Sequence, residues 1–168
     1  MDYAELVTEV ALRCGLPEIP ARAAYFVTQA ERDLEKALRV RQMETTATVT
    51  ADAEGKGTLP ADFLAWRSDG AEWFPVTGNT FIAQPDQVVE MTYYRKLPSV
   101  VTNGTNWLLT LEPEIYVLSM LQQIYAAASD ERLQATSSQR NERIRQLVRE
   151  DRIARYGAQK IDYSGLMR

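Results

Sequence analysis

The stretch that decides the fold is TYYRKLPSVVTNGTNWLLTLEPEIYVLSML, residues 92–121. It begins with β-branched and aromatic residues typical of a strand and ends in the apolar pattern of a helix. Residues 98–106 lie between these patterns and are rich in turn formers, so they predict a turn of the chain. Trp107, Leu108 and Leu109 follow at once. We expect them to be core anchors that pin the returning chain against the helix beginning at Pro113.

Two long helices are predicted after this turn. Pro113 suits a first helical turn because its missing N–H needs no partner there, and Glu114 places negative charge at the positive end of the helix dipole. The following residues are apolar on most sides, which is typical of a central helix. Ser129 or Asp130 can cap a last helix that runs to about Tyr156.

Two helices are also predicted at the N-terminus. Asp2 can cap the first, whose apolar residues recur at helical spacing as far as Cys14, and Gly15 suits the position just past its end. Pro20 fits the first turn of the second helix. Glu35 and Arg39 on that helix have the i, i+4 spacing of an ion pair.

Short strands are predicted between these pairs of helices. Residues 45–50, 73–76, 80–83 and 88–94 have β-strand composition, and Val89, Met91 and Tyr93 would share one face of the last strand. Residues 54–57 read as a turn, and residues 59–64 as a short helical turn opened by Pro60. The predicted class is therefore α+β, mainly α: a helical bundle with a small antiparallel β-rich insertion and an extended C-terminal tail.

We expect one structural domain in four parts. These are N-terminal bundle helices (1–42), a β-rich insertion (43–98), C-terminal bundle helices (99–156) and an extended C-terminal arm (157–168). The chain of 168 residues is long enough to bury a core without disulfides. No apolar run is long enough to span a bilayer, and the N-terminus lacks a secretion signal, so we expect synthesis in the cytoplasm and no membrane partner.

The residue inventory excludes several kinds of chemistry. The chain has no histidine and a single cysteine, Cys14, which rules out Cys/His zinc sites and histidine-dependent nucleophile systems. Cys14 lies on the apolar side of its helix and is expected to be a buried thiol. No carboxylate pair or phosphate-binding glycine loop is recognisable. We expect no cofactor, no metal and no catalytic residue.

The charge is unevenly distributed. The last 30 residues hold eight basic and four acidic side chains, a net charge of +4, so the remainder carries −8 to give the total of −4. Arg140 to Arg155 could neutralise phosphates in a small nucleic-acid-binding module, or could form a solvated helix or protein-binding face. The irregular tail could be a frayed terminus or a segment that orders on a partner.

The order of these features resembles the head-to-tail adaptor (connector) proteins of tailed bacteriophages and of phage-derived gene transfer agents. The resemblance rests on four stretches in sequence: LPADFL (59–64), YYRKLP (93–98), TNWLL (105–109) and EPEIY (112–116). It covers most of the chain and is clearest over residues 59–157.

The resemblance implies a structural virion protein and not an enzyme. Such adaptors form a ring, typically of twelve copies, beneath the portal, where they extend the DNA channel and contact the next tail, nozzle or stopper protein. Genomic DNA would pass through the lumen without sequence-specific binding. The expected location is the head–tail junction, after synthesis in the host bacterial cytoplasm. The alternative that remains open is the nucleic-acid-binding module.

Site residues follow from the same resemblance and from the charge pattern. The C-terminal arm would bind the portal, and loops of the insertion together with the basic last helix would face neighbouring subunits or the tail. The expected portal-binding residues are Tyr156, Ile161, Tyr163, Leu166, Met167 and Arg168. The expected inter-subunit or tail-facing residues are Trp73, Phe74, Arg145, Arg149 and Arg152.

Overall fold

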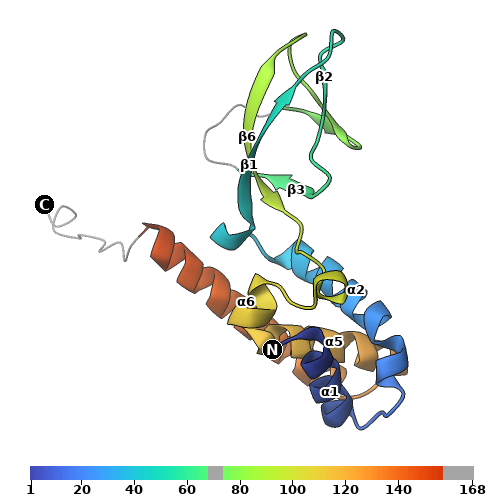
Figure 1. Cartoon of the computed structure of the whole chain (residues 1–168). Coiled ribbons are helices and arrows are strands. Elements are labelled where there is room, and N and C mark those ends of the chain that lie inside the picture. Colours follow the sequence, from blue (N-terminus) through green and yellow to red (C-terminus); the bar gives the residue numbers. More distant parts are fainter. Residues whose placement is uncertain (68–73, 157–168) are drawn as a thin grey trace, which may run out of the picture.

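The computed structural model describes residues 1–67 and 74–156 and combines a helical bundle with a β-rich insertion (Figure 1). The helices are α1 (Tyr3–Cys14), α2 (Ile19–Ala37), α3 (Val100–Asn103), α4 (Trp107–Leu111), α5 (Pro113–Ala128) and α6 (Leu133–Tyr156), with a 3₁₀ turn at Arg41–Met43. The strands are β1 (Glu44–Thr50), β2 (Lys56–Thr58), β3 (Phe63–Trp66), β4 (Val76–Thr77), β5 (Thr80–Ile82) and β6 (Val88–Arg95). The predicted α+β class is confirmed. The predicted tail lies outside the described residues.

Helix α5 is the centre of the bundle, as its apolar sequence predicts. It packs against α1, α2, α4 and α6. Ile115, Tyr116 and Met120 are fully buried within it. A helix surrounded in this way needs apolar residues on nearly every side, because no face remains for water.

The ends of the first helix follow the predicted chemistry. Asp2 and Glu5 form a capping box, in which each side chain accepts the backbone N–H of the other residue. Gly15 ends the helix with φ +73°, a conformation that favours glycine. Cys14 is buried, as predicted. Pro20 lies in the first turn of α2 and Pro113 in the first turn of α5.

The insertion consists of two three-stranded antiparallel sheets, with strand orders β1-β6-β3 and β2-β5-β4. Buried and exposed residues alternate along β6, and Val89, Met91 and Tyr93 share the buried face, as predicted. This face forms a second apolar core with Leu59 and Phe81. The bundle core and the insertion core have no buried residue in common.

Three local predictions about the insertion and the turn are corrected. The predicted turn opened by Pro60 is present but shorter than residues 59–64: the N–H of Phe63 donates to the carbonyl of Pro60 at 2.9 Å, and strand β3 begins at Phe63. Lys56 and Gly57 belong to β2 rather than to a turn. The segment 98–106 contains the short helix α3. Gly104 ends this helix with φ +75°, a conformation that favours glycine.

Two predictions about side chains are also corrected. Of the two candidate caps for α6, Ser129 ends α5 in the left-handed conformation, whereas the side chain of Asp130 accepts the backbone N–H of Arg132, just before α6, at 2.8 Å. Arg39 donates to the backbone carbonyl of Glu35 and not to its carboxylate. The carboxylate of Glu35 instead accepts the N–H of Leu97 at 3.0 Å. The predicted ion pair therefore gives way to a contact that holds the chain returning from β6.

A buried carboxylate also holds the segment of chain that returns from β6 to the helical bundle. Glu31, on α2, is 7% exposed and its Oε1 accepts the N–H of Val100 at 2.8 Å. The hydroxyl of Tyr116 donates to the same oxygen at 3.4 Å. The central helix, α2 and the start of α3 therefore meet at one buried oxygen. Burial, partly offset by these hydrogen bonds, raises the pKa of Glu31 above its ordinary value.

Asn106 extends this contact to α4. Its Nδ2 donates to the hydroxyl oxygen of Tyr116 at 2.6 Å and to the carbonyl of Pro98 at 2.7 Å. Its Oδ1 accepts the N–H of Leu109 at 2.9 Å, which caps α4. Leu108 and Leu109 are fully buried, so their role as core anchors is confirmed. Trp107 is only partly buried against the same core.

Leu109→Ala should lower the free energy of unfolding by about 2–5 kcal/mol, because it removes a fully buried side chain and leaves a cavity. Chemical denaturation measures this change. Leu111→Ala on the same helix is the matched control: Leu111 is 53% exposed, so the expected change is within about 0.5 kcal/mol. Equal losses in the two variants would contradict the burial of Leu109.

Glu31→Gln should become more stabilising relative to the native chain as pH rises from 4 to 7. The raised pKa of Glu31 means that its ionised form is disfavoured in the folded protein, so the native chain loses stability as pH rises through that pKa. Glutamine has no such titration. Thermal unfolding across this pH range measures the difference, and Glu131→Gln, at an exposed position, controls for net charge. A pH-independent difference would contradict the prediction.

Candidate interaction surfaces

A cluster of charged residues joins the end of α6 to the base of the insertion. Asp151 is 8% exposed and accepts the side-chain Nε of Arg41 at 2.9 Å. Its two carboxylate oxygens also lie 3.3 Å from the backbone nitrogen of Arg41. One turn later, Arg155 forms an ion pair with Glu44, the first residue of β1, and lies 3.9 Å from Asp151. We call these four residues the charged joint.

Three members of the charged joint are largely shielded from water, whereas the side chain of Arg41 is 45% exposed. The side chains of Arg155 and Glu44 are 16% and 15% exposed. Burial lowers the pKa of Arg155, but hydrogen bonds to Tyr156, Glu44 and Tyr94 outweigh it and raise the pKa above its ordinary value. Arg67, which follows β3, also pairs with Glu44 at 3.2 Å. The joint therefore ties the last turn of α6 to both outer strands of one sheet.

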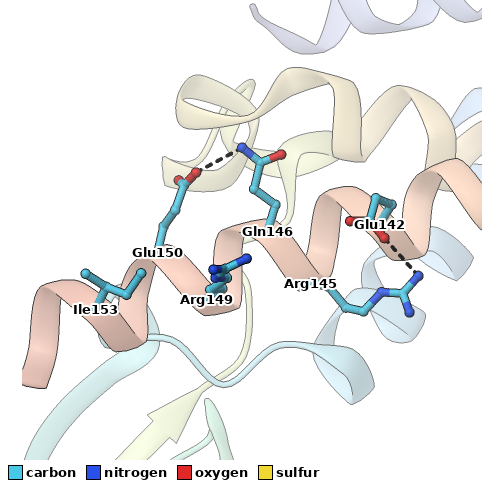
Figure 2. Close-up of a pocket in the computed structure, with 6 residues that line it drawn as sticks. All are labelled: Glu142, Arg145, Gln146, Arg149, Glu150 and Ile153. Atoms are coloured by element: carbon cyan, nitrogen blue, oxygen red, sulfur yellow. Dashed lines mark hydrogen bonds and ion pairs between the residues drawn. The ribbon is translucent and has the colours of Figure 1, made fainter. Parts of the chain in front are cut away.

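The outward face of α6 presents alternating charges to solvent. Figure 2 shows a shallow pocket along this face, lined by Glu142, Arg145, Gln146, Arg149, Glu150 and Ile153. These positions recur at three- and four-residue spacing, so they lie on one side of the helix. Arg145 pairs with Glu142 at 3.0 Å, and Gln146 donates to Glu150 at 2.9 Å.

The predicted inter-subunit arginines lie on this solvent-facing part of α6. Arg145, Arg149 and Arg152 are all exposed. Within residues 1–67 and 74–156, Arg149 and Arg152 have no carboxylate within ion-pairing distance. They are available to contact a partner, but the structure contains none to test that role.

Two arginines counted toward the basic last helix face inward. Arg140 is 7% exposed and its Nε donates to the hydroxyl of Ser119 at 2.9 Å. Arg155 belongs to the charged joint. Glu142 and Glu150 interrupt the cations that remain exposed. This arrangement is less basic than the sequence suggests and disfavours continuous contact with phosphates.

The other predicted site residues are only partly placed. Phe74 packs in the insertion core, with ring centroids 5.6 Å from Phe81 and 6.1 Å from Trp66. Tyr156 ends α6 and is 62% exposed. Trp73 and the predicted portal-binding residues Ile161, Tyr163, Leu166, Met167 and Arg168 lie outside the described residues.

Sequence reasoning missed the residues that connect the parts of the fold. Glu44, Asp151 and Arg155 are polar residues at ordinary-looking positions, and their partners are more than 100 residues away in the chain. Glu31 carried a weak signal, because it falls at helical spacing from Val27 and Leu34 on the buried side of α2. A carboxylate on an apolar face indicates a buried hydrogen-bond acceptor.

The parts of the chain described by the structure contain no group of three potential metal-ligating His, Cys, Asp or Glu side chains. No helix in these parts is long and apolar enough to cross a membrane.

The described residues thus form a helical bundle with a β-rich insertion and an exposed charged helix. The chain matches the family model described as SU10 adaptor protein over residues 1–72 and 64–161, and it belongs to this family of phage head–tail adaptors. No curated protein matches it. This match confirms the resemblance to phage adaptors and indicates a structural protein. The extension to gene transfer agents stays a prediction.

Asp151→Ala should destabilise the protein by about 1–3 kcal/mol, because it removes the buried carboxylate that accepts the backbone N–H and the Nε of Arg41. Urea denaturation measures the loss. Glu150→Ala, at the exposed position next to it, is the matched control and should change stability by less than about 0.5 kcal/mol. If both variants unfold at the same urea concentration as the native chain, the joint contributes no stability.

Proposed function

We propose that this protein is a head-to-tail adaptor that forms a ring under the portal, extends the DNA channel and joins the capsid to the tail. The observation that supports this most directly is the family match, which extends over nearly the whole chain. In this proposal the chain has no catalytic role, needs no cofactor and is located at the head–tail junction of the virion.

The ring would be built from copies of this chain, with twelve as the expected number. A ring requires two unlike surfaces that meet head to tail, and the rotation between copies decides whether it closes. The exposed arginines of α6 and the excess negative charge of the remainder offer such a pair. Arg145, Arg149 and Arg152 are the proposed contacts on the basic side.

The C-terminal arm, residues 157–168, would dock on the portal. It follows directly after α6, whose last turn is anchored to the insertion through the charged joint. A helix held at that end gives the arm a fixed point of departure. The opposite part of the ring would contact the next tail, nozzle or stopper protein, with Trp73 and Phe74 as the proposed contacts. DNA would pass through the lumen without sequence-specific binding.

The alternative, a nucleic-acid-binding module built on α6, is less well supported. Arg140 and Arg155 are engaged within the protein, and acidic side chains lie among the exposed arginines. The observed arrangement suits pairing with another protein surface better than it suits a phosphate backbone.

Removal of residues 158–168 should abolish binding to the portal and leave the folded protein intact. Co-purification with the cognate portal, followed by electron microscopy, measures binding, and thermal unfolding of the truncated chain verifies its fold. Full-length Ser164→Ala is the control for a minor change within the arm. Portal binding by the truncated chain at native affinity would rule out the docking-arm assignment.

A further inference from the structure

Strand β1 is an edge strand without the usual protection. Its sheet has the order β1-β6-β3, so only one side of β1 is paired. Natural proteins protect exposed edges with charged residues, proline, bulges or very short strands. β2 and β4 have three and two residues, and β3 pairs through a register shift. β1 has seven residues, and positions 45–50, TTATVT, contain no charge, proline or glycine.

The free side of β1 can be assigned residue by residue. The N–H of Ala51 donates to the carbonyl of Gln87 at 2.9 Å, on the side of β6. Backbone groups alternate sides along an antiparallel strand, so the groups of residues 45, 47 and 49 face β6 and those of Thr46, Thr48 and Thr50 face away. The N–H of Asp52 points away from β6 to Lys56, at 2.9 Å, which agrees with this parity.

Three threonines therefore present a row of backbone donors and acceptors to the outside. Among the described residues, no backbone group pairs with the outward N–H or C=O groups of Thr46, Thr48 and Thr50. Their side chains are also exposed. Such a row is a template for an added strand, in which main-chain hydrogen bonds provide the affinity.

The described part of the chain ends beside the start of β1. Arg155 pairs with Glu44, the first residue of β1, and the described chain ends one residue later at Tyr156 (Figure 1). The remaining 12 residues, GAQKIDYSGLMR, can span about 40 Å when extended. Strand β1 is about 23 Å long. The segment is long enough to run along the whole edge.

The composition of the segment suits this edge. Ile161 and Tyr163 are strand-forming residues, and Gly157 permits a change of direction after α6. The segment carries Lys160, Asp162 and Arg168, and the adjoining part of the sheet, residues 45–50 of β1 and 88–94 of β6, carries Glu90 and no cation. The two cations of the segment therefore meet no like charge at this edge.

We propose that in the free protein the C-terminal segment, residues 157–168, pairs with the β1 edge of its own chain as an added strand. The added strand satisfies the backbone groups of Thr46, Thr48 and Thr50 and protects the edge from pairing with other chains before assembly. Its release would make the arm available to the portal. That consequence rests on the proposed function, whereas the strand pairing itself does not.

Amide hydrogen exchange by NMR on the isolated full-length chain tests this pairing, and no portal is needed. The amides of Thr46, Thr48 and Thr50 should be protected alongside those of Ala47 and Val49, which are bonded to β6. In full-length Asp162→Pro/Tyr163→Pro, one of the two adjacent prolines removes an N–H that faces β1 in either register, so exchange at the three threonines should become at least tenfold faster. Exchange at Ala47 and Val49 should not change, which shows within the same sample that the sheet is intact.

Two outcomes would overturn the proposal. The first is unprotected threonine amides in the native chain, which means that the edge is open. The second is protection that appears only as protein concentration rises, which means that the added strand comes from a second copy. Either result leaves the portal-binding experiment unaffected, so failure of this inference and failure of the adaptor proposal are distinguishable.

Discussion

The fold depends on one buried carboxylate. The chain leaves the helical bundle after α2, builds two sheets and must re-enter so that α5 can occupy the centre of the bundle. Glu31 of α2 contacts the chain where it re-enters the bundle, because the Oε1 of Glu31 accepts the N–H of Val100. Tyr116 of the central helix donates to the same oxygen. An unpaired N–H at this depth would cost about 1–3 kcal/mol, so the contact fixes where the return begins as well as holding it there.

The two apolar cores share no buried residue, but both apolar and polar contacts connect the insertion to the bundle. Leu64 of β3 and Tyr94 of β6 pack against the bundle core. The charged joint adds a directional constraint, because Asp151 and Arg155 on α6 contact Arg41 and Glu44 on the segment that leads into β1. Ion pairs need defined geometry, whereas apolar contacts tolerate sliding. A component that positions other proteins needs a defined angle between its parts.

The sequence predicted the elements better than their connections. Periodicity located α1, α2, α5, α6 and β6, since each buries a face that repeats along the chain. It found the turn opened by Pro60 but missed strand β3, which begins at Phe63, and it failed at Glu35, whose carboxylate accepts a distant backbone N–H. The four residues of the charged joint were missed for the same reason. A local pattern contains information about local burial, but a polar residue's partner is set by the tertiary fold.

Interaction surfaces are harder still to predict from the sequence, because one chain contains only half of each contact. Exposure places Arg149 and Arg152 where a partner can reach them, and inward hydrogen bonding removes Arg140 from that set. The edge of β1 carries more information than these charges do. A charge pattern on a helix is compatible with water as its only partner, because water solvates both signs. A row of uncharged threonines on a seven-residue free edge exposes unpaired backbone groups and invites wrong pairing. A strand that covers this edge would pair those groups and remove the risk.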